Sequence, residues 1–320
     1  MKFFQRLKYE VWKVLRGFLL LALIGTIVLT VVNYGKKTKR PDRLAMVIDT
    51  DSGYGADDLF AITRVLIEPG LNPEALLASQ YNQSEGSNDS TMLVSHRLNG
   101  EILLLHGFED IPCLTGSMNH TGYSGNPVPR PSPASRYILD RARAVPYGQK
   151  IDIVTLGPVT NLATALLTDS TLAGKIKWYG LGLKFDHKDR IWNKNEFNAR
   201  NDLDAMDYLL NLNSLETHIM PANVAASVFY HRRDAMDLLE GRGYKWDLLL
   251  NRFSETCPGC TQIDLSSLML IEAILNPDHV TEKKFKTPPE NTYRDIYVYT
   301  WIDGKKVLRE FRNQVAKAMN

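Results

Sequence analysis

Two kinds of segment alternate along the chain from residue 44 onward. Apolar positions at helical spacing predict helices over residues 57–67, 85–98, 135–145, 159–167, 203–212, 232–240, 244–253, 265–275 and 307–319. Short apolar or alternating runs predict strands over residues 44–50, 75–80, 101–105, 151–156, 176–183 and 295–301. Because strands and helices alternate, the pattern predicts an α/β fold: an open, mostly parallel (mixed) sheet with helices on both faces.

The N-terminal part of the chain has a different pattern. Residues 17–35 (GFLLLALIGTIVLTVVNYG) carry no charge and, as a helix, are long enough to cross a hydrocarbon layer of about 30 Å. Residues 1–16 form a basic tail and residues 36–43 a basic linker, so the flanking charges alone do not orient the segment. No A-x-A-like cleavage site follows the run, which favours an uncleaved transmembrane signal anchor over a cleaved signal peptide. We expect a single-pass membrane protein with residues 44–320 as a catalytic domain on the non-cytoplasmic side.

Composition limits the possible partners. The 38 Lys and Arg residues nearly balance the 36 Asp and Glu residues, so the chain has no overall field that would attract nucleic acid. Much of the positive charge lies in the first 43 residues, so the remainder is mildly acidic. That balance suits a cation site better than a groove for a phosphate backbone.

The chain has three cysteines, of which Cys257 and Cys260 form a C-x-x-C motif with Pro and Gly between them. Such a pair is compatible with a disulfide, half of a zinc site or a redox pair. No second C-x-x-C motif is present. A local disulfide or two free thiols is therefore favoured over a metal site.

Four carboxylates, Asp49, Asp51, Asp57 and Asp58, surround a glycine-containing turn between the first predicted strand and the first predicted helix. Like charges crowded at the end of a strand repel one another, and a hard divalent cation would offset that repulsion. Calcium prefers oxygen ligands of this kind, whereas the lack of a nearby His or Cys cluster disfavours zinc.

The same acids are also compatible with purely structural roles. Asp57 and Asp58 could serve only as an N-cap and a helix-dipole partner, and Asp49 and Asp51 could merely end a strand. A D-x-D motif at the end of a first strand also occurs in phosphatases that use an aspartyl nucleophile. Those enzymes have Thr or Val where this chain has Gly53, which lowers the weight of that alternative.

Residues 47–62 (VIDTDSGYGADDLFAI) resemble the N-terminal signature of the nucleoside hydrolase family, D-T-D-P-G-x-D-D. Ser52 replaces the usual Pro of this signature. Three residues separate Gly53 from Asp57, whereas the best-known form of the signature has one residue there. The longer spacing resembles that of a divergent branch of the family. Later segments agree in order along the chain: residues 75–83 ending near Asn82, residues 151–166 with L-G-P-V-T-N, Glu196-Phe197-Asn198, residues 202–205, and the helix that Asp264 opens.

The resemblance implies calcium-dependent hydrolysis of the N-glycosidic bond of ribonucleosides, through a state resembling an oxocarbenium ion. It implies a nucleoside hydrolase-like fold and a Ca²⁺ ion held by the side chains of Asp51, Asp58 and Asp264 and the backbone carbonyl of Leu156. Asp51 would accept the proton of the attacking water, with Asp49 orienting it. The residues implied to hold the ribose are Asp57, Asn82, Glu196 and Asn198.

The group that assists the departing base is the part of the reaction that the resemblance determines least. Many relatives have a His immediately before the late Asp, whereas this chain has Ile263. Trp192 could stack on the base and is included among the candidate substrate-binding residues, although an aromatic at the rim or in the core would look the same. His187 is a second candidate acid, although a lone His in a loop is usually solvated.

Two alternatives to the hydrolase remain at this point. One is a non-catalytic, membrane-anchored protein of the same fold that binds a sugar or nucleoside, and the other is the aspartyl-nucleophile phosphatase. The expected partners are a nucleoside substrate and a membrane, reached through the N-terminal helix, with no nucleic acid. Relatives of the resembled family are often dimers or tetramers, so a homo-oligomer is also an open expectation.

Overall fold

The structure is a computed structural model that describes residues 45–319 except residues 72, 85, 89 and 123. The predicted basic tail, signal anchor and linker (residues 1–43) lie outside the described residues. Among the residues that are described, no helix is both long enough and apolar enough to cross a membrane.

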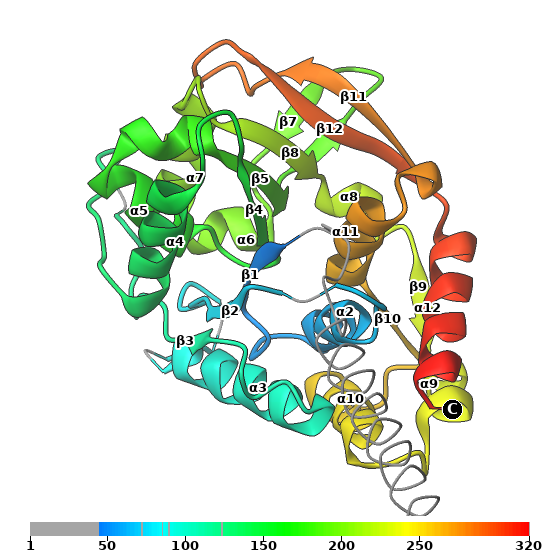
Figure 1. The fold of residues 1–320 in the computed structure, drawn as a ribbon. Coiled ribbons are helices and arrows are strands. Elements are labelled where there is room, and N and C mark those ends of the chain that lie inside the picture. The colour runs from blue at the N-terminus through cyan, green and yellow to red at the C-terminus, as the bar shows by residue number, and fades with distance from the viewer. Residues whose placement is uncertain (1–44, 72, 85, 89, 123, 320) are drawn as a thin grey trace, which may run out of the picture. The chain divides into compact units, whose positions relative to one another are not determined.

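A sheet of eight strands forms the centre of the described region, in the order β11-β12-β8-β5-β4-β1-β2-β3 (Figure 1). Every neighbouring pair in it is parallel except β11 and β12, which are antiparallel. The predicted open, mostly parallel (mixed) sheet is therefore confirmed. Its strands are β1 (Met46–Thr50), β2 (Ala75–Ala78), β3 (Cys113–Leu114), β4 (Ile151–Thr155), β5 (Ile176–Leu181), β8 (Glu216–Met220), β11 (Val280–Lys286) and β12 (Asp295–Ile302).

Two short antiparallel ribbons lie outside the sheet. One joins β6 (Lys184–Asp186) to β7 (Ile191–Asn193), and the other joins β9 (Phe229–His231) to β10 (Gln262–Asp264). The helices are α2 (Asp57–Leu66), α3 (Thr91–His106), α4 (Pro133–Ala144), α5 (Thr160–Thr168), α6 (Phe197–Asn201), α7 (Leu203–Asn211), α8 (Ala222–Ala225), α9 (Arg232–Leu239), α10 (Tyr244–Thr256), α11 (Ser266–Leu275) and α12 (Gly304–Ala318), with 3-10 turns η1 (Ser170–Lys175) and η2 (Pro277–His279).

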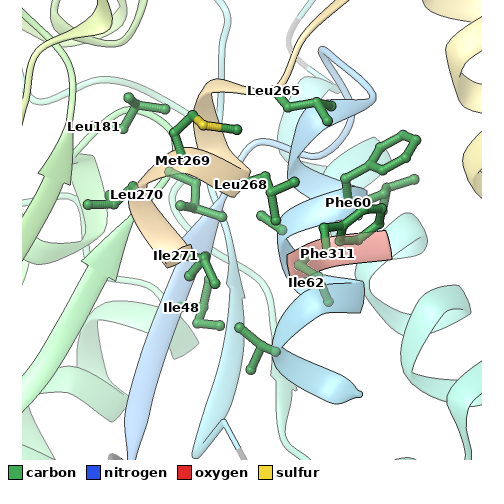
Figure 2. Close-up of a cluster of buried hydrophobic side chains, with 14 of the residues drawn as sticks. Ile48, Phe60, Ile62, Leu181, Leu265, Leu268, Met269, Leu270, Ile271 and Phe311 are labelled. Carbon is green, nitrogen blue, oxygen red and sulfur yellow. The ribbon is translucent and has the colours of Figure 1, made fainter. Parts of the chain in front are cut away.

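Helices cover both faces of the sheet. Successive residues of a strand point to opposite faces, so neighbouring residues of β1 belong to different cores. Ile48 of β1 belongs to a core shared with α2, α3, α10, α11 and α12, whereas its neighbour Val47 belongs to a core shared with α4, α5 and α7. Figure 2 shows the first of these cores, with Ile48 close to Ile271 of α11 and Phe60 of α2 close to Phe311 of α12. The prediction of helices on both faces is thus confirmed.

The predicted strand over residues 101–105 is wrong, because these residues continue α3. The apolar run reads as a strand in isolation, but Leu98, Ile102 and Leu103 are buried while Leu104 is 60% exposed, which is a helical pattern. The predicted helix over residues 85–98 starts too early, since α3 begins at Thr91. Strands β3, β8 and β11 were not predicted, because β3 is only two residues long and β8 and β11 mix polar and apolar residues.

A buried ion pair joins α2 to α11. Arg64 is 1% exposed and Glu272 is 0% exposed, and Arg64 Nε lies 2.5 Å from Glu272 Oε1. Arg64 also pairs with Glu68 at 2.7 Å, and Asn276 Nδ2 donates to the other oxygen of Glu272 at 2.6 Å. The pair therefore fixes the relative position of the two helices whose first turns carry Asp57, Asp58 and Ser267.

His106 ends α3 in a place that disfavours its charged form. Its ring packs edge-on against Trp246 with centroids 5.8 Å apart, and its Nε2 is buried without a hydrogen-bond partner among the described residues. Burial, and to a lesser extent Lys245, lowers the pKa of His106 from 6.5 to about 4. Between these pH values the unfolded chain binds a proton that the native chain does not bind. The native state is therefore expected to lose stability as the pH falls through this interval.

We expect His106→Gln to remove part of this acid sensitivity, because glutamine does not ionise. Free energies of unfolding in urea, measured from about pH 4 to about pH 7, should fall less steeply with acidification for the variant than for the parent. His187→Gln is the matched control, since His187 is exposed between β6 and β7. Equal slopes for the parent and His106→Gln would contradict a buried neutral imidazole.

Candidate functional site

A cavity of about 650 Å³ opens where the strands β1, β4 and β5 end. Asp51 follows β1 directly, Leu156 follows β4 directly, and Leu181 is the last residue of β5. Parallel α/β sheets bind ligands beyond the carboxyl ends of their strands, so this cavity is in the expected place. The predicted site residues that line it are Asp51, Asp57, Asp58, Leu156, Glu196, Asn198 and Asp264.

The acidic residues are held by the first turns of two helices. Asp58 accepts hydrogen bonds from Thr50 and from Ser267 Oγ, the latter at 2.5 Å, and Ser267 N donates to Asp57 at 3.1 Å. Ser267 lies in the first turn of α11, so α11 ties down the start of α2. The third carboxylate, Asp264, accepts from Ser266 Oγ at 2.8 Å.

The pKa values of these carboxyl groups are raised. Burial is the largest cause for Asp51, whose pKa lies well above its usual range, and the charges of Asp58 and Asp57 add to it. Burial, then Asp58 and Asp264, raise the pKa of Asp57 to about 7. Burial raises the pKa of Asp49 to about 6, although hydrogen bonds from Ser79 and Asn161 oppose that rise. The cluster therefore holds its full negative charge only if a positive charge offsets it.

The chemistry of these donors fits a hard cation. Asp51 lines the cavity, and its Oδ2 is buried and has no hydrogen-bond partner among the described residues. The donors are all oxygen atoms, as calcium and magnesium prefer. Over the part of the chain that the structure describes, no three His, Cys, Asp or Glu side chains are placed so that they could hold a metal ion together. The carbonyl of Leu156 and water would have to complete the ligand shell.

Two close contacts shape the acidic end of the cavity. Gly157 follows Leu156, and a Cβ atom at Gly157 would collide with the carboxylate of Asp51, so only glycine fits there. Asp49 does not line the cavity, and its carboxylate accepts from Ser79 Oγ at 2.8 Å and from Asn161 Nδ2 at 3.0 Å. Asn161, in the first turn of α5, thus anchors Asp49.

Glu196 and Asn198 are fixed by backbone contacts. Glu196 caps α6, is 7% exposed, and accepts from the backbone nitrogens of Leu183 at 3.2 Å and Ala199 at 3.1 Å. Burial raises its pKa. Asn198 Nδ2 donates to the carbonyls of Leu156 at 2.7 Å and Leu181 at 3.0 Å, so it joins the ends of β4 and β5.

Asn82 and Trp192 do not line this cavity. The amide of Asn82 donates to the carbonyl of Met118 and accepts from Thr91. Trp192 stacks on Phe185 with ring centroids 4.1 Å apart, and its Nε1 donates to the carbonyl of Lys286 at 3.0 Å. The side chains of both residues are thus used in local packing.

Three aromatic residues that were not among the candidate site residues do line the cavity: Tyr54, Phe197 and Phe229. Tyr54 stacks on Phe197 with centroids 3.9 Å apart. Phe229 pairs with Asp264 across the ribbon of β9 and β10. Tyr54 could have been noticed, since it lies in the extended spacing before Asp57. No local sequence signal pairs Phe229 with Asp264.

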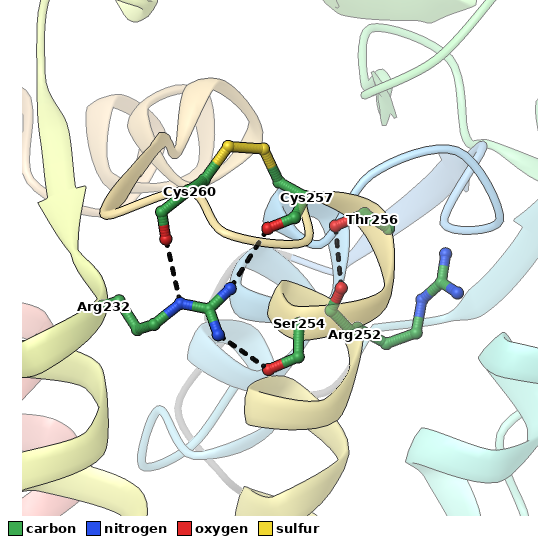
Figure 3. Close-up of a disulfide and its surroundings, with 6 residues drawn as sticks. All are labelled: Arg232, Arg252, Ser254, Thr256, Cys257 and Cys260. Carbon is green, nitrogen blue, oxygen red and sulfur yellow. Dashed lines mark hydrogen bonds between the residues drawn. A yellow bond between two sulfur atoms is a disulfide. The ribbon is translucent and has the colours of Figure 1, made fainter.

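Cys257 and Cys260 form a disulfide between α10 and β10, which settles the alternative left open by the sequence (Figure 3). Arg232 donates to the carbonyls of Cys257 at 3.1 Å and Cys260 at 2.9 Å, and to Ser254 Oγ at 3.2 Å. Cys257 borders the cavity. The disulfide and Arg232 therefore fix the segment that leads to Asp264.

Comparison with known proteins agrees with this geometry. The family described as inosine-uridine preferring nucleoside hydrolase matches residues 46–303. A probable uridine nucleosidase 2 of Oryza sativa subsp. japonica is 23% identical over 268 residues, which cover 76% of this chain and 77% of that protein.

Solved structures share the fold. A plant nucleoside hydrolase has a TM-score of 0.66 and 20% identity, over 85% of this chain and 98% of its own. A purine-preferring ribonucleoside hydrolase from Gardnerella vaginalis has a TM-score of 0.62 and 18% identity, over 86% of this chain and 99% of its own. The family match over most of the chain thus confirms the resemblance seen in the sequence motifs: the chain belongs to the inosine-uridine preferring nucleoside hydrolase family and is an N-ribosyl hydrolase of nucleosides.

Proposed function

We propose that this hydrolase works with a calcium ion held by Asp51, Asp58, Asp264 and the carbonyl of Leu156. The observation that carries the proposal is the buried, unpartnered Oδ2 of Asp51, a residue that lines the same cavity as Asp58, Leu156 and Asp264. The raised pKa values of Asp51, Asp57 and Asp58 support it, because a cation would let these groups stay ionised. When bound, such an ion makes a nearby water more acidic and helps to orient it.

The other steps of the reaction are assigned to side chains that line the cavity. Asp51 accepts a proton from the water whose oxygen attacks the anomeric carbon of the ribose. Asp57, Glu196 and Asn198 bind the ribose hydroxyls, since they line the same cavity as Asp51. The bond between ribose and base breaks with its electron pair on the base, and the base takes up a proton as it leaves. This proposal assigns no role to Asn82 or Trp192, because neither side chain lines the cavity.

A panel of purine and pyrimidine nucleosides, assayed for released reducing sugar with and without a calcium chelator, tests the proposal. We expect activity with calcium and a fall of at least about 100-fold after chelation, since a catalytic metal supplies several kcal/mol of stabilisation. Restoring calcium should restore the rate. Equal rates with and without chelator would rule out the metal, and no sugar release from any nucleoside would rule out the hydrolysis.

We also propose that residues 17–35 anchor the enzyme in a membrane with the catalytic domain on the non-cytoplasmic side. The uncharged length of this segment and the lack of a cleavage site support this placement. The oligomeric state stays a prediction.

A further inference from the structure

The loop between β1 and α2 connects two parts of the acidic cluster. Asp51 opens this loop, and Asp57 begins the helix that follows it. Ser267 of α11 holds the far end, because its backbone nitrogen donates to Asp57. Residues 52–56 between the two acids contain no helix or strand, only a turn in which Tyr54 N donates to the carbonyl of Asp51 at 2.8 Å. Such a loop needs further contacts to offset the entropy that it loses in a single conformation.

The helix α3 holds the first half of this loop. Ser52 is 0% exposed, and its Oγ donates to Asn99 Oδ1 at 2.8 Å. The next residue, Gly53, donates through its backbone nitrogen to Ser95 Oγ at 3.3 Å. A Cβ atom at Gly53 would lie 2.7 Å from the hydroxyl oxygen of Tyr81 and 3.1 Å from the backbone nitrogen of Ser95. The loop therefore passes in close contact with α3 at these two residues.

Arg252 of α10 contacts the loop at the same place. Its Nη2 donates to the carbonyl of Gly53 at 3.0 Å, although the two residues are 199 positions apart in the sequence. Its Nη1 pairs with Glu255 at 2.9 Å, and its side chain is only 13% exposed. Figure 3 shows this side chain pointing away from the disulfide and from Arg232. Arg252 thus joins α10 to the residue two positions after Asp51.

We propose that Ser52 and Arg252 are positioning residues, which tie the loop to α3 and to α10. Neither residue lines the cavity, so both act on Asp51 and Asp57 through the backbone between those acids. A displacement of about 1 Å in a reacting group can cost about 100-fold in rate. Because a hydrogen bond from a charged donor is stronger than one between neutral groups, Arg252 contributes more than Ser52. This inference rests on the proposed roles of Asp51 and Asp57.

Arg252→Met in the full chain tests the contact with Gly53, because it keeps an apolar stem but removes the donor. We expect kcat for nucleoside hydrolysis to fall by about 10- to 100-fold. KM should rise by a smaller factor, because Glu196 and Asn198 line the cavity from a different part of the chain. Arg252→Lys keeps a charged donor on a flexible stem and should recover part of the lost rate.

Glu255→Gln is the matched control, because it removes the ion pair of Arg252 but leaves the contact with Gly53. Its kcat should stay within about threefold of the parent, since Glu255 is 60% exposed and surface ion pairs contribute little. Ser52→Ala removes the contact with α3 and gives a second measurement if Arg252→Met does not fold. It should also lower kcat, by a smaller factor than Arg252→Met.

Amide hydrogen exchange of residues 51–56, measured by mass spectrometry, follows the loop without turnover. We expect this segment to exchange faster in Arg252→Met than in the parent or in Glu255→Gln, while the amides of β5 keep their rates. A variant that was merely less stable would exchange faster in β5 as well, and that result would overturn the positioning role.

The kinetic results can also overturn the inference. It fails if Arg252→Met has a kcat within about threefold of the parent, or if Arg252→Lys is as slow as Arg252→Met. If Arg252→Met does not fold, an unchanged kcat in Ser52→Ala overturns it. If Asp51→Asn has the rate of the parent, the proposed role of Asp51 fails, and the exchange of residues 51–56 still tests the anchoring of the loop. If Asp51→Asn is slow and Arg252→Met is not, the positioning fails and the role of Asp51 stands.

Discussion

Asp51→Asn is expected to lower kcat for nucleoside hydrolysis by about 100- to 10,000-fold, the contribution of a general base. Asn keeps the shape of the side chain but cannot accept the proton of the attacking water. It also removes the negative charge of a cavity carboxylate that has a buried, unpartnered oxygen. Initial rates of ribose release at saturating nucleoside and saturating calcium measure the effect.

Asp110→Asn is the matched control, because Asp110 is exposed in the turn after α3. It should have the activity of the parent. Thermal unfolding of both variants shows whether any loss of rate comes from loss of structure. A folded Asp51→Asn enzyme with a rate within about threefold of the parent would place the base elsewhere and favour a non-catalytic binding role for the acidic cluster.

Arg64→Met is expected to cause the largest loss of stability, about 3–5 kcal/mol in the free energy of unfolding. The substitution leaves Glu272 unpaired, and this side chain is 0% exposed between α2 and α11. An uncompensated charge in that position costs much more than the pair itself contributes. Urea titration at neutral pH measures the change.

Arg97→Met is the control for the removal of an arginine from an ion pair. Arg97 pairs with Glu101 at 3.4 Å on the surface of α3, where the two side chains are 66% and 41% exposed. Its loss should cost no more than about 1 kcal/mol. The double variant Arg64→Met with Glu272→Met should be more stable than Arg64→Met alone, because it removes the unpaired charge. A double variant as unstable as the single one would show that packing, and not charge, dominates at this position.

The sheet and the acidic end of the cavity could be predicted because their signals are local. The strands β1, β4 and β5 are short apolar runs, and a cavity residue lies at the end of each: Asp51 after β1, Leu156 after β4 and Leu181 at the end of β5. Parallel topology then brings these strand ends together without further information. Asp264 lies in the same cavity because the helix α11 that follows it packs on α2. The phosphatase alternative did not require Asp264 to lie near Asp51.

The rest of the site depends on contacts between distant parts of the chain. Trp192 and Asn82 are residue types that could bind a nucleoside, but neither lines the cavity. Trp192 contacts Phe185 and the carbonyl of Lys286. Asn82 makes hydrogen bonds with Met118 and Thr91. Phe229 is placed at the cavity by the pairing of β9 with β10, which are separated in the chain by α9 and α10. Hydrogen bonds and strand pairs of this kind leave no periodic trace in the sequence, so the position of Phe229 at the cavity could not be foreseen.

The two outer strands of the sheet have a consequence for how copies of the chain could meet. An unpaired strand edge invites another chain to add a strand, and proteins block such growth with charged or very short edge strands. The outer strand β11 presents Lys283, Lys284 and Lys286 at exposed positions, and the opposite outer strand, β3, is only two residues long. Both edges of the central sheet are therefore protected against extension, which disfavours assembly of several copies through these two strands.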